Sequence, residues 1–207
     1  MKRSLNILIA GFLALSVSLA AAQDTTTETT TPVNISTAVT KQQVPAPANP
    51  ITPETNAVTS SQIKELKERI IELQNKGTLK LKDFLPCSKI ITIGSYEPLK
   101  DAKIKQDEIL YVYFEPENFF TNKSQERYEI WLTEDIHILG EGGELLMEKP
   151  NAVDMHFNSA TPILDIYFNN HIEFKGVQPG KYLFKAILYD KLKGTNSSET
   201  LPFEVVK

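Results

Sequence analysis

Apolar positions run almost without a break over residues 5–19, directly after two basic residues, Lys2 and Arg3. Three alanines follow, which is the small-residue pattern of a signal-peptide cleavage site. A permanent membrane helix needs about 20 apolar residues, and this stretch is shorter. The pattern therefore predicts a cleavable signal peptide over residues 1–22. We expect an exported protein, periplasmic or secreted, with no membrane span after cleavage.

Residues 23–59 show no apolar periodicity and contain no aromatic residue. Thr, Pro, Ala, Val and Asn dominate this stretch, which cannot bury enough apolar surface to offset the conformational entropy of the chain. The composition predicts a disordered Thr/Pro-rich tether. A plain spacer is favoured over a glycosylated stalk.

A helical pattern replaces the tether at residues 60–77. Apolar residues recur there at steps of three and four, which places them on one face of a helix. They are Ile63, Leu66, Ile70 and Leu73. Four turns are short for a stable two-stranded coiled coil. We therefore expect this face to dock on the domain that follows, with a partner helix as the alternative.

From residue 78 to residue 207 the apolar pattern has period two, which is typical of β-strands. Clusters of Pro and Gly separate the candidate strands. These strands are 79–84, 89–95, 108–115, 127–133, 135–139, 144–148, 163–168, 171–174, 181–190 and 200–206. Many short strands in one domain of this size predict an all-β fold, a sandwich preceded by one short amphipathic helix.

The C-terminal run FKGVQPGKYLFKAILYDKLKGTNSSETLPFEVV resembles the final hairpin of bacterial immunoglobulin-like and fibronectin type III-like domains. An apolar residue precedes a Pro-Gly corner, a Tyr opens a long strand that ends near Asp, and a Phe-x-Val strand closes the pattern. The residues at these places are Val177, Pro179, Gly180, Tyr182, Asp190, Phe203 and Val205. The resemblance implies an immunoglobulin-like architecture and no particular function, because such domains host many functions.

The net charge bears on the expected partner, and the cysteine content bears on disulfides and lipid attachment. Removal of Lys2 and Arg3 leaves 20 basic against 26 acidic residues, a formal charge of 20 − 26 = −6. Nucleic acid is therefore not an expected partner. Cys87 is the only cysteine, so no internal disulfide can form, and no cysteine stands at the cleavage point to carry a lipid. We expect Cys87 to be a small buried residue.

Motifs for catalysis, metal binding or cofactor binding are missing from the sequence. The histidines His137, His156 and His171 form no metal-ligand pair with one another. Asp154 and His156 share one face of an extended segment, but a metal site needs further ligands. We therefore predict no cofactor, no metal and no catalytic residue.

Acidic residues offer the remaining route to catalysis. A pair of carboxylates facing each other across a cleft could act as in a glycosidase, but the sequence does not give their separation. The candidates are Glu115, Glu117, Glu134, Asp135, Glu141 and Glu144.

Three candidate strands have more apolar surface than one buried face requires. Each carries aromatic or aliphatic residues on its second face as well, and in one sheet these would form a single outer patch. The patch residues are Tyr111, Tyr113, Trp131, Leu183, Ile187 and Tyr189. Such a surface is normally covered or used. We expect the helix to lie across it; the alternative is an open groove for a protein or a glycan.

These patterns favour a non-catalytic exported module with an interaction or structural role in the cell envelope. Its partner would be an envelope or extracellular protein or a glycan. The alternative is a carbohydrate-binding module that uses the outer aromatic patch, and a hydrolase with acidic catalytic residues is less favoured. The sequence does not determine the oligomeric state.

Overall fold

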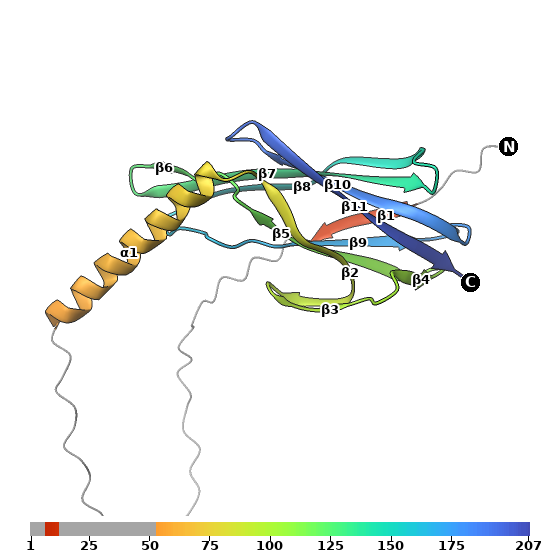
Figure 1. Ribbon diagram of the computed structural model, residues 1–207, viewed down its shortest axis with the longest axis horizontal. Helices are drawn as coiled ribbons and strands as arrows, with labels where there is room; N and C mark the ends of the chain where they lie inside the picture. Colours follow the sequence, from red (N-terminus) through yellow and green to blue (C-terminus); the bar gives the residue numbers. More distant parts are fainter. Residues whose placement is uncertain (1–6, 13–52) are drawn as a thin grey trace, which may run out of the picture.

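The computed structural model describes residues 7–12 and 53–207 (Figure 1). The predicted tether lies outside the described residues up to position 52, as does most of the predicted signal peptide. The described elements, in chain order, are β1 (Ile7–Phe12), α1 (Pro53–Lys76), β2 (Lys80–Thr92), β3 (Ser95–Pro98), β4 (Lys103–Lys105), β5 (Ile109–Glu117), β6 (Asn122–Ser124), β7 (Arg127–Gly140), β8 (Leu145–Ser159), β9 (Phe168–Phe174), β10 (Gly180–Asp190) and β11 (Thr195–Val206).

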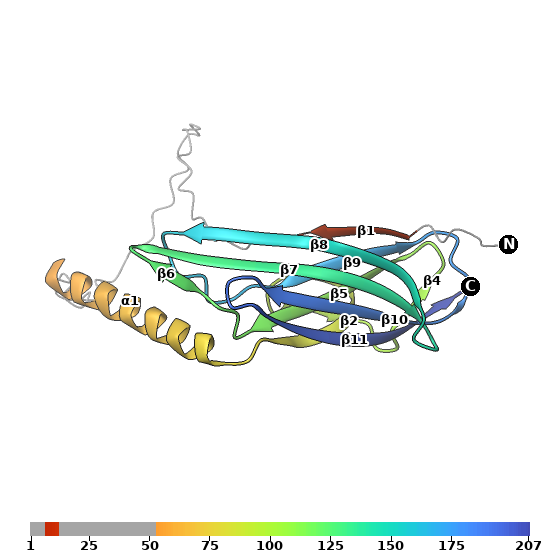
Figure 2. The ribbon, with the colours of Figure 1, turned by 90° about the horizontal axis from the view of Figure 1, so that it is seen from above.

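The strands form two sheets that pack face to face. In sheet A the order is β1-β9-β5-β2-β3, and in sheet B it is β4-β11-β10-β7-β6, with β8 paired to the free side of β7. All pairs are antiparallel except β4 with β11. Figures 1 and 2 show the strands of both sheets running along the length of the domain. The prediction of an all-β domain with one preceding helix is therefore confirmed at this level.

One hydrophobic core fills the space between the sheets. The inward residues of β5 and β7 are at most 2% exposed, as a period-two pattern predicts. Phe114 of sheet A stacks on Phe168, with ring centroids 4.6 Å apart. Phe174 of sheet A meets Phe203 of sheet B at 5.0 Å. Aromatic contacts thus join neighbouring strands within a sheet as well as the two sheets.

Strand β8 continues through Pro150, a residue that the sequence pattern treats as a turn. It lies at the edge of sheet B, where a missing backbone N–H is tolerated, and its pairing with β7 shifts register beside this residue. The N–H of Asn151 donates to Oδ1 of Asp135 at 2.8 Å, which supports the irregular backbone. The turn between β7 and β8 has Gly143 at φ 85°, a conformation that favours glycine.

Strand β1 forms one edge of sheet A and pairs antiparallel with β9, from Ile7 opposite Phe174 to Phe12 opposite Asn169. Its residues belong to the predicted signal peptide. Cleavage after position 22 stays a prediction, and it would remove β1 from sheet A. Strand β9 would then become the edge of that sheet.

Helix α1 begins at Pro53, whereas the sequence pattern starts the helix at residue 60. Proline is favoured in the first helical turn, since its fixed φ suits the helix and its missing N–H would have no partner there. In Figures 1 and 2 the helix leaves one end of the domain, and its N-terminal half lies beyond the strand ends. In the described residues no helix is both long and apolar enough to cross a membrane.

Candidate functional site

The six residues of the predicted aromatic patch do not form one surface. Tyr111 and Tyr113 lie on β5 of sheet A, whereas Trp131 lies on β7 of sheet B. Leu183, Ile187 and Tyr189 lie on β10, which also belongs to sheet B. The prediction of a single outer patch is therefore wrong, because it assumed that the three strands share a sheet.

The sheet A part of this patch is largely covered by its own domain. Tyr113 has no exposed surface and lies between the rings of Tyr96 and Tyr167, at centroid distances of 4.3 and 5.7 Å. Cys87 is buried in the same small cluster, as predicted. Burial raises the pKa of its thiol to about 11, so it is protonated at neutral pH.

The sheet B part is centred on Trp131, which is half-buried on the outer face. Its indole stacks on the imidazole of His156 of β8, with centroids 4.7 Å apart and ring planes 16° apart. The indole N–H donates to Oδ1 of Asp154 at 3.0 Å. Asp154 and His156 are the pair that the sequence raised as one side of a metal site. In the structure both hold the tryptophan ring in place.

Two further polar residues extend this cluster on the outer face of sheet B. Nε2 of His156 lies 2.9 Å from Oε1 of Glu129. The amide of Asn122 donates to the other carboxylate oxygen of Glu129 at 3.2 Å. The hydrogen bonds from His156 and Asn122 hold the pKa of Glu129 below its usual value. We call Trp131, Asn122, Glu129, Asp154 and His156 the Trp131 cluster.

The remaining patch residues continue along β10 on the same face of sheet B. In the strand register Tyr189 lies opposite Thr133, Ile187 opposite Asp135 and Leu183 opposite Leu139. Burial, followed by a hydrogen bond to Asp135, raises the pKa of Tyr189. Lys185 lies between Leu183 and Ile187 on this face, so the apolar side chains do not form a continuous groove.

The six candidate acids are spread over the domain. Glu134 is buried between the sheets and Asp135 lies on the outer face of sheet B, whereas Glu141 and Glu144 lie at the turn between β7 and β8. Only Glu115 and Glu117 share a cavity, which is described next. Because the six acids lie so far apart, no more than two of them share a site.

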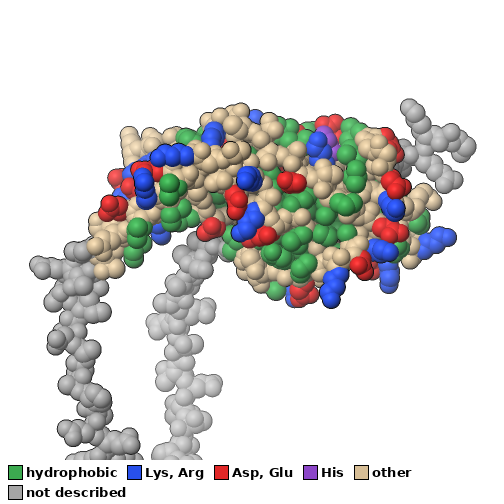
Figure 3. Space-filling model, in the orientation of Figure 1, with side chains coloured by type: hydrophobic (Ala, Val, Ile, Leu, Met, Phe, Trp, Pro, Cys, Tyr) green, Lys and Arg blue, Asp and Glu red, His purple; other side chains and the backbone are tan. Residues whose placement is uncertain are grey.

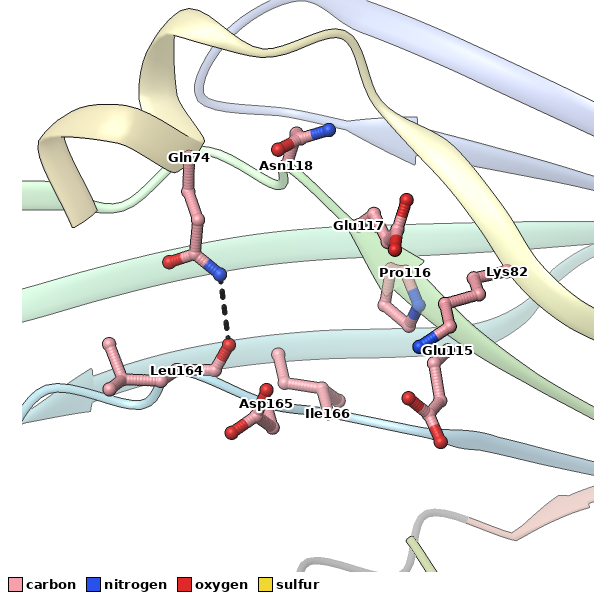
Figure 4. Close-up of a pocket in the computed structure, with 9 residues that line it drawn as sticks. All are labelled: Gln74, Lys82, Glu115, Pro116, Glu117, Asn118, Leu164, Asp165 and Ile166. Atoms are coloured by element: carbon pink, nitrogen blue, oxygen red, sulfur yellow. Dashed lines mark hydrogen bonds between the residues drawn. The ribbon is translucent and has the colours of Figure 1, made fainter. Parts of the chain in front are cut away.

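A cavity of about 270 Å³ lies between the end of α1, strand β5 and residues 164–166. Glu115, Glu117 and Asp165 line it together with Lys82. Gln74 of α1 closes one side by donating to the backbone oxygen of Leu164 at 3.0 Å. Figure 4 shows the carboxylates of Glu115 and Glu117 on opposite sides of Pro116, lying apart. The cavity therefore offers no facing pair formed by these two acids.

The part of the chain that the structure describes contains no preformed set of metal ligands. Nowhere in these residues do three His, Cys, Asp or Glu side chains gather closely enough to hold an ion. Nε2 of His137 lies 3.4 Å from Oε1 of Glu148, and the ring centroids of His171 and Tyr111 are 6.4 Å apart.

The apolar stripe of α1 is exposed to solvent. The exposed fractions of Ile63, Leu66, Ile70 and Leu73 are 49, 64, 42 and 55%. These four, which we call the α1 stripe, include most of the large exposed hydrophobic residues among residues 59–207. Figure 3 shows hydrophobic side chains along the visible flank of the helix. The prediction that the helix buries this stripe across the aromatic patch is therefore wrong.

A different face of α1 contacts the two-sheet domain, which explains this correction. Ile71 is only 5% exposed. Glu68 accepts hydrogen bonds from the hydroxyl of Tyr128 and from the Lys123 ammonium, each at 2.9 Å. These two donors, Lys123 first, lower the pKa of Glu68. The helix thus docks through one apolar residue and a polar pattern that periodicity alone does not reveal.

The C-terminal end of α1 is fixed by hydrogen bonds that no pattern in the sequence predicts. The side chain of Asn75 exchanges two hydrogen bonds with the backbone of Thr121, at 2.8 and 2.9 Å. The ammonium of Lys193 donates to the backbone oxygens of Asn75 and Gly77, at 2.9 and 2.7 Å. A cation at a helix C-terminus also interacts favourably with the helix dipole. These contacts fix the direction in which α1 leaves the domain.

Comparison with known proteins does not show a family. No protein-family model and no curated protein matches the chain. Among the solved structures that it resembles is the alkylpurine DNA glycosylase AlkC from Pseudomonas fluorescens, bound to DNA that contains an abasic-site analog. It has 11% identity and a TM-score of 0.36 over 75% of this chain and 40% of that chain.

Two other solved structures resemble parts of the chain. A family 123 glycoside hydrolase from Clostridium perfringens has 11% identity and a TM-score of 0.37, over 63% of this chain and 28% of that chain. The N-terminal domain of PorA has 9% identity and a TM-score of 0.26, over 62% of this chain and 97% of that chain. The chain thus spans less than half of the glycosylase and of the hydrolase. Likenesses this distant carry no argument about fold or function.

Proposed function

We propose that this chain is a non-catalytic exported interaction module of the cell envelope, in which the two-sheet domain presents α1 to a protein partner. One observation carries the proposal: the α1 stripe is exposed although the helix is firmly docked through another face. Exposed apolar surface in water costs free energy, and a contiguous patch of it is typical of a binding site. The predicted signal peptide supports a periplasmic or secreted location.

We also propose an immunoglobulin-like or fibronectin type III-like architecture for the two-sheet domain. The strands β10 and β11 form the C-terminal hairpin that the sequence resemblance implies. The hydroxyl of Tyr182, near the start of β10, donates to the backbone oxygen of Gln178 at 2.7 Å. Tyrosines that bond back to the backbone just upstream of the next-to-last strand are a hallmark of such domains. This contact supports the proposal beyond the pattern of residue types.

A photo-crosslinking amino acid placed at Gln62, an exposed position beside the α1 stripe, tests the interaction proposal in the native cell. We expect a specific adduct with an exported protein. The double variant Leu66→Glu and Ile70→Glu should lose it, because charge on the stripe opposes burial. Leu145→Glu is the matched control, since Leu145 is 52% exposed but lies outside the helix. The same adducts in all three proteins would refute the proposal.

Glycan binding at the Trp131 cluster is a second candidate function, and the setting of the tryptophan ring favours it. A planar aromatic ring held by hydrogen bonds and flanked by carboxylate and imidazole groups can combine an apolar face with polar specificity. Sugars present the same combination of apolar C–H faces and hydroxyl groups. The Trp131 cluster would then be the binding surface, and Tyr111 and Tyr113 would have no part in it.

Loss of glycan binding in Trp131→Ala is the expected result if this second candidate is correct. Removal of a central aromatic anchor weakens binding by roughly tenfold or more. Co-sedimentation with cell-wall polysaccharide measures the effect. Tyr111→Ala should bind like the wild-type protein, because Tyr111 lies on the other sheet. Equal binding by wild type and Trp131→Ala would exclude the site.

A further inference from the structure

The α1 stripe has the residue pattern of a two-stranded coiled coil. Ile63 and Ile70 are seven residues apart, as are Leu66 and Leu73, so they occupy the a and d positions of two heptads. β-branched residues at a together with leucine at d favour two parallel helices. We propose that the stripe binds the α1 stripe of a second copy of this chain in a parallel homodimer. This inference rests on the proposed function and names its partner.

The face of α1 that contacts the two-sheet domain differs from the face that carries the α1 stripe. Contacts with the two-sheet domain involve Lys64, Glu68, Ile71 and Asn75, and also Gln74 at the C-terminal end of the helix. At 100° per residue the first four contacts point about 150° away from the α1 stripe, and Gln74 points about 60° away from it. The N-terminal half of the helix also lies beyond the strand ends (Figures 1 and 2). A second helix can therefore lie along the stripe without displacing the contacts of Lys64, Glu68, Ile71 and Asn75, and only the Gln74 contact borders it.

The charges beside the stripe favour the parallel orientation over the antiparallel one. In a parallel pair the flanking residue Gln62 meets Lys67 of the other copy, and Arg69 meets Gln74, so no like charges face each other. An antiparallel pair that matches all four apolar layers instead brings both copies of Lys67 and of Arg69 to its centre. Like charges at that distance repel.

Pre-ordering of α1 removes the objection that two heptads are too short. A short isolated helix is unstable because forming it costs chain entropy. Here Lys193 and Asn75 already hold the C-terminal turn in the monomer. The entropic cost of forming the helix is met within the monomer, and dimerisation costs only association. We expect a weak, reversible dimer.

Analytical ultracentrifugation of the purified full chain over a wide concentration range tests the proposal without any other protein present. The expected result is a reversible monomer–dimer equilibrium. The double variant Leu66→Glu and Ile70→Glu should raise the dissociation constant at least about 100-fold, because charge enters the apolar seam. Helical circular dichroism of this variant confirms that it folds, and Leu145→Glu should dimerise like the wild type.

Cysteine cross-linking tests the orientation. Ile63→Cys should oxidise to a disulfide-linked dimer by itself, since equivalent residues of the apolar seam adjoin in a parallel pair, whereas the buried Cys87 leaves the wild type unlinked. Cross-linking seen only in a mixture of Ile63→Cys with Leu73→Cys would overturn the parallel arrangement. A dimer that persists in the Leu66→Glu and Ile70→Glu variant would overturn the assigned surface.

The homodimer and the proposed function can fail separately. A chain that stays monomeric at every concentration overturns the homodimer. If the photo-crosslinker at Gln62 still captures a different protein in cells, and the stripe variant abolishes that adduct, the interaction function survives. If neither self-association nor a stripe-dependent adduct is found, both proposals fail.

Discussion

Glu134→Gln should stabilise the protein at neutral and alkaline pH, by an amount that grows as the pH rises. Glu134 has no exposed surface, and burial raises the pKa of its carboxyl group from 4.5 to about 8. The folded-state pKa therefore lies above the unfolded one. The stabilising contribution of the protonated carboxyl group is complete below pH 4.5 and is lost as the pH rises through about 8.

The size of this effect follows from the same two pKa values. Between pH 4.5 and about 8 the free energy of unfolding falls by up to about 1.4 kcal/mol per pH unit, or on the order of 5 kcal/mol in total. Glutamine has no charge to ionise and so avoids this loss. It also keeps the oxygen that accepts from the Asn170 amide at 2.8 Å.

Denaturant unfolding from pH 4 to pH 9 measures this difference, with Trp131 fluorescence and circular dichroism as probes. Because other groups titrate as well, the informative quantity is the free energy of unfolding of Glu134→Gln minus that of the wild type. Glu117→Gln, the same change at an exposed position, should show a difference that varies little with pH. If the Glu134→Gln and wild-type curves stay parallel over this range, Glu134 does not titrate as described.

Glu134 and Asn170 form a buried polar pair within a mainly apolar core. Oε2 of Glu134 and Oδ1 of Asn170 have no hydrogen-bond partner among the described residues. A proton on Glu134 would add the donor that these two acceptors lack. The pair joins β7 of sheet B to β9 of sheet A, so it can favour one alignment of the sheets over others. Such a role for buried polar groups is known in some folds.

The strands were predictable wherever apolar and polar residues alternate along the sequence. In β7 the alternation correctly placed Tyr128, Ile130 and Leu132 inward, because period-two burial is a local property of the sequence, whereas β5 and β10 have apolar residues on both faces. Assignment of strands to sheets is a non-local property, and the pattern placed Tyr111 and Trp131 together by analogy alone. Pro150 was wrongly interpreted as a turn, since an edge strand tolerates a proline that a central strand cannot.

The docking face of α1 was not predictable for a related reason. Apolar periodicity identifies the stripe whose exposure to water is unfavourable, and burial against the nearest domain was the expected outcome. The helix instead docks through hydrogen bonds made by Glu68 and Asn75, residue types that are common on any solvated helix face. Their partners, Tyr128 and Thr121, are distant in sequence, so no local signal marks them. The stripe was thus identified correctly and its environment was not.

Asp190→Ala should lower the free energy of unfolding by about 3 kcal/mol, because two backbone donors would lose a charged acceptor. Asp190 is 1% exposed. Its carboxylate accepts from the backbone N–H of Phe120 at 2.7 Å and from that of Lys193 at 2.9 Å. The small cavity left by alanine cannot supply equivalent acceptors in a site that excludes solvent. Denaturant unfolding measures the loss, and Asp101→Ala, at an exposed turn, should change it by less than about 0.5 kcal/mol.

The same substitution should also loosen α1, which separates an anchoring role from a general loss of stability. The Phe120 N–H adjoins Thr121, which binds Asn75, and Lys193 holds the last helical carbonyls. Loss of Asp190 therefore frees both segments that fix the end of the helix. Under native conditions, hydrogen exchange of the backbone amides over residues 71–77 should accelerate more than exchange in β5. Uniform acceleration across both segments would mean that Asp190 stabilises the fold as a whole and has no particular part in holding the helix.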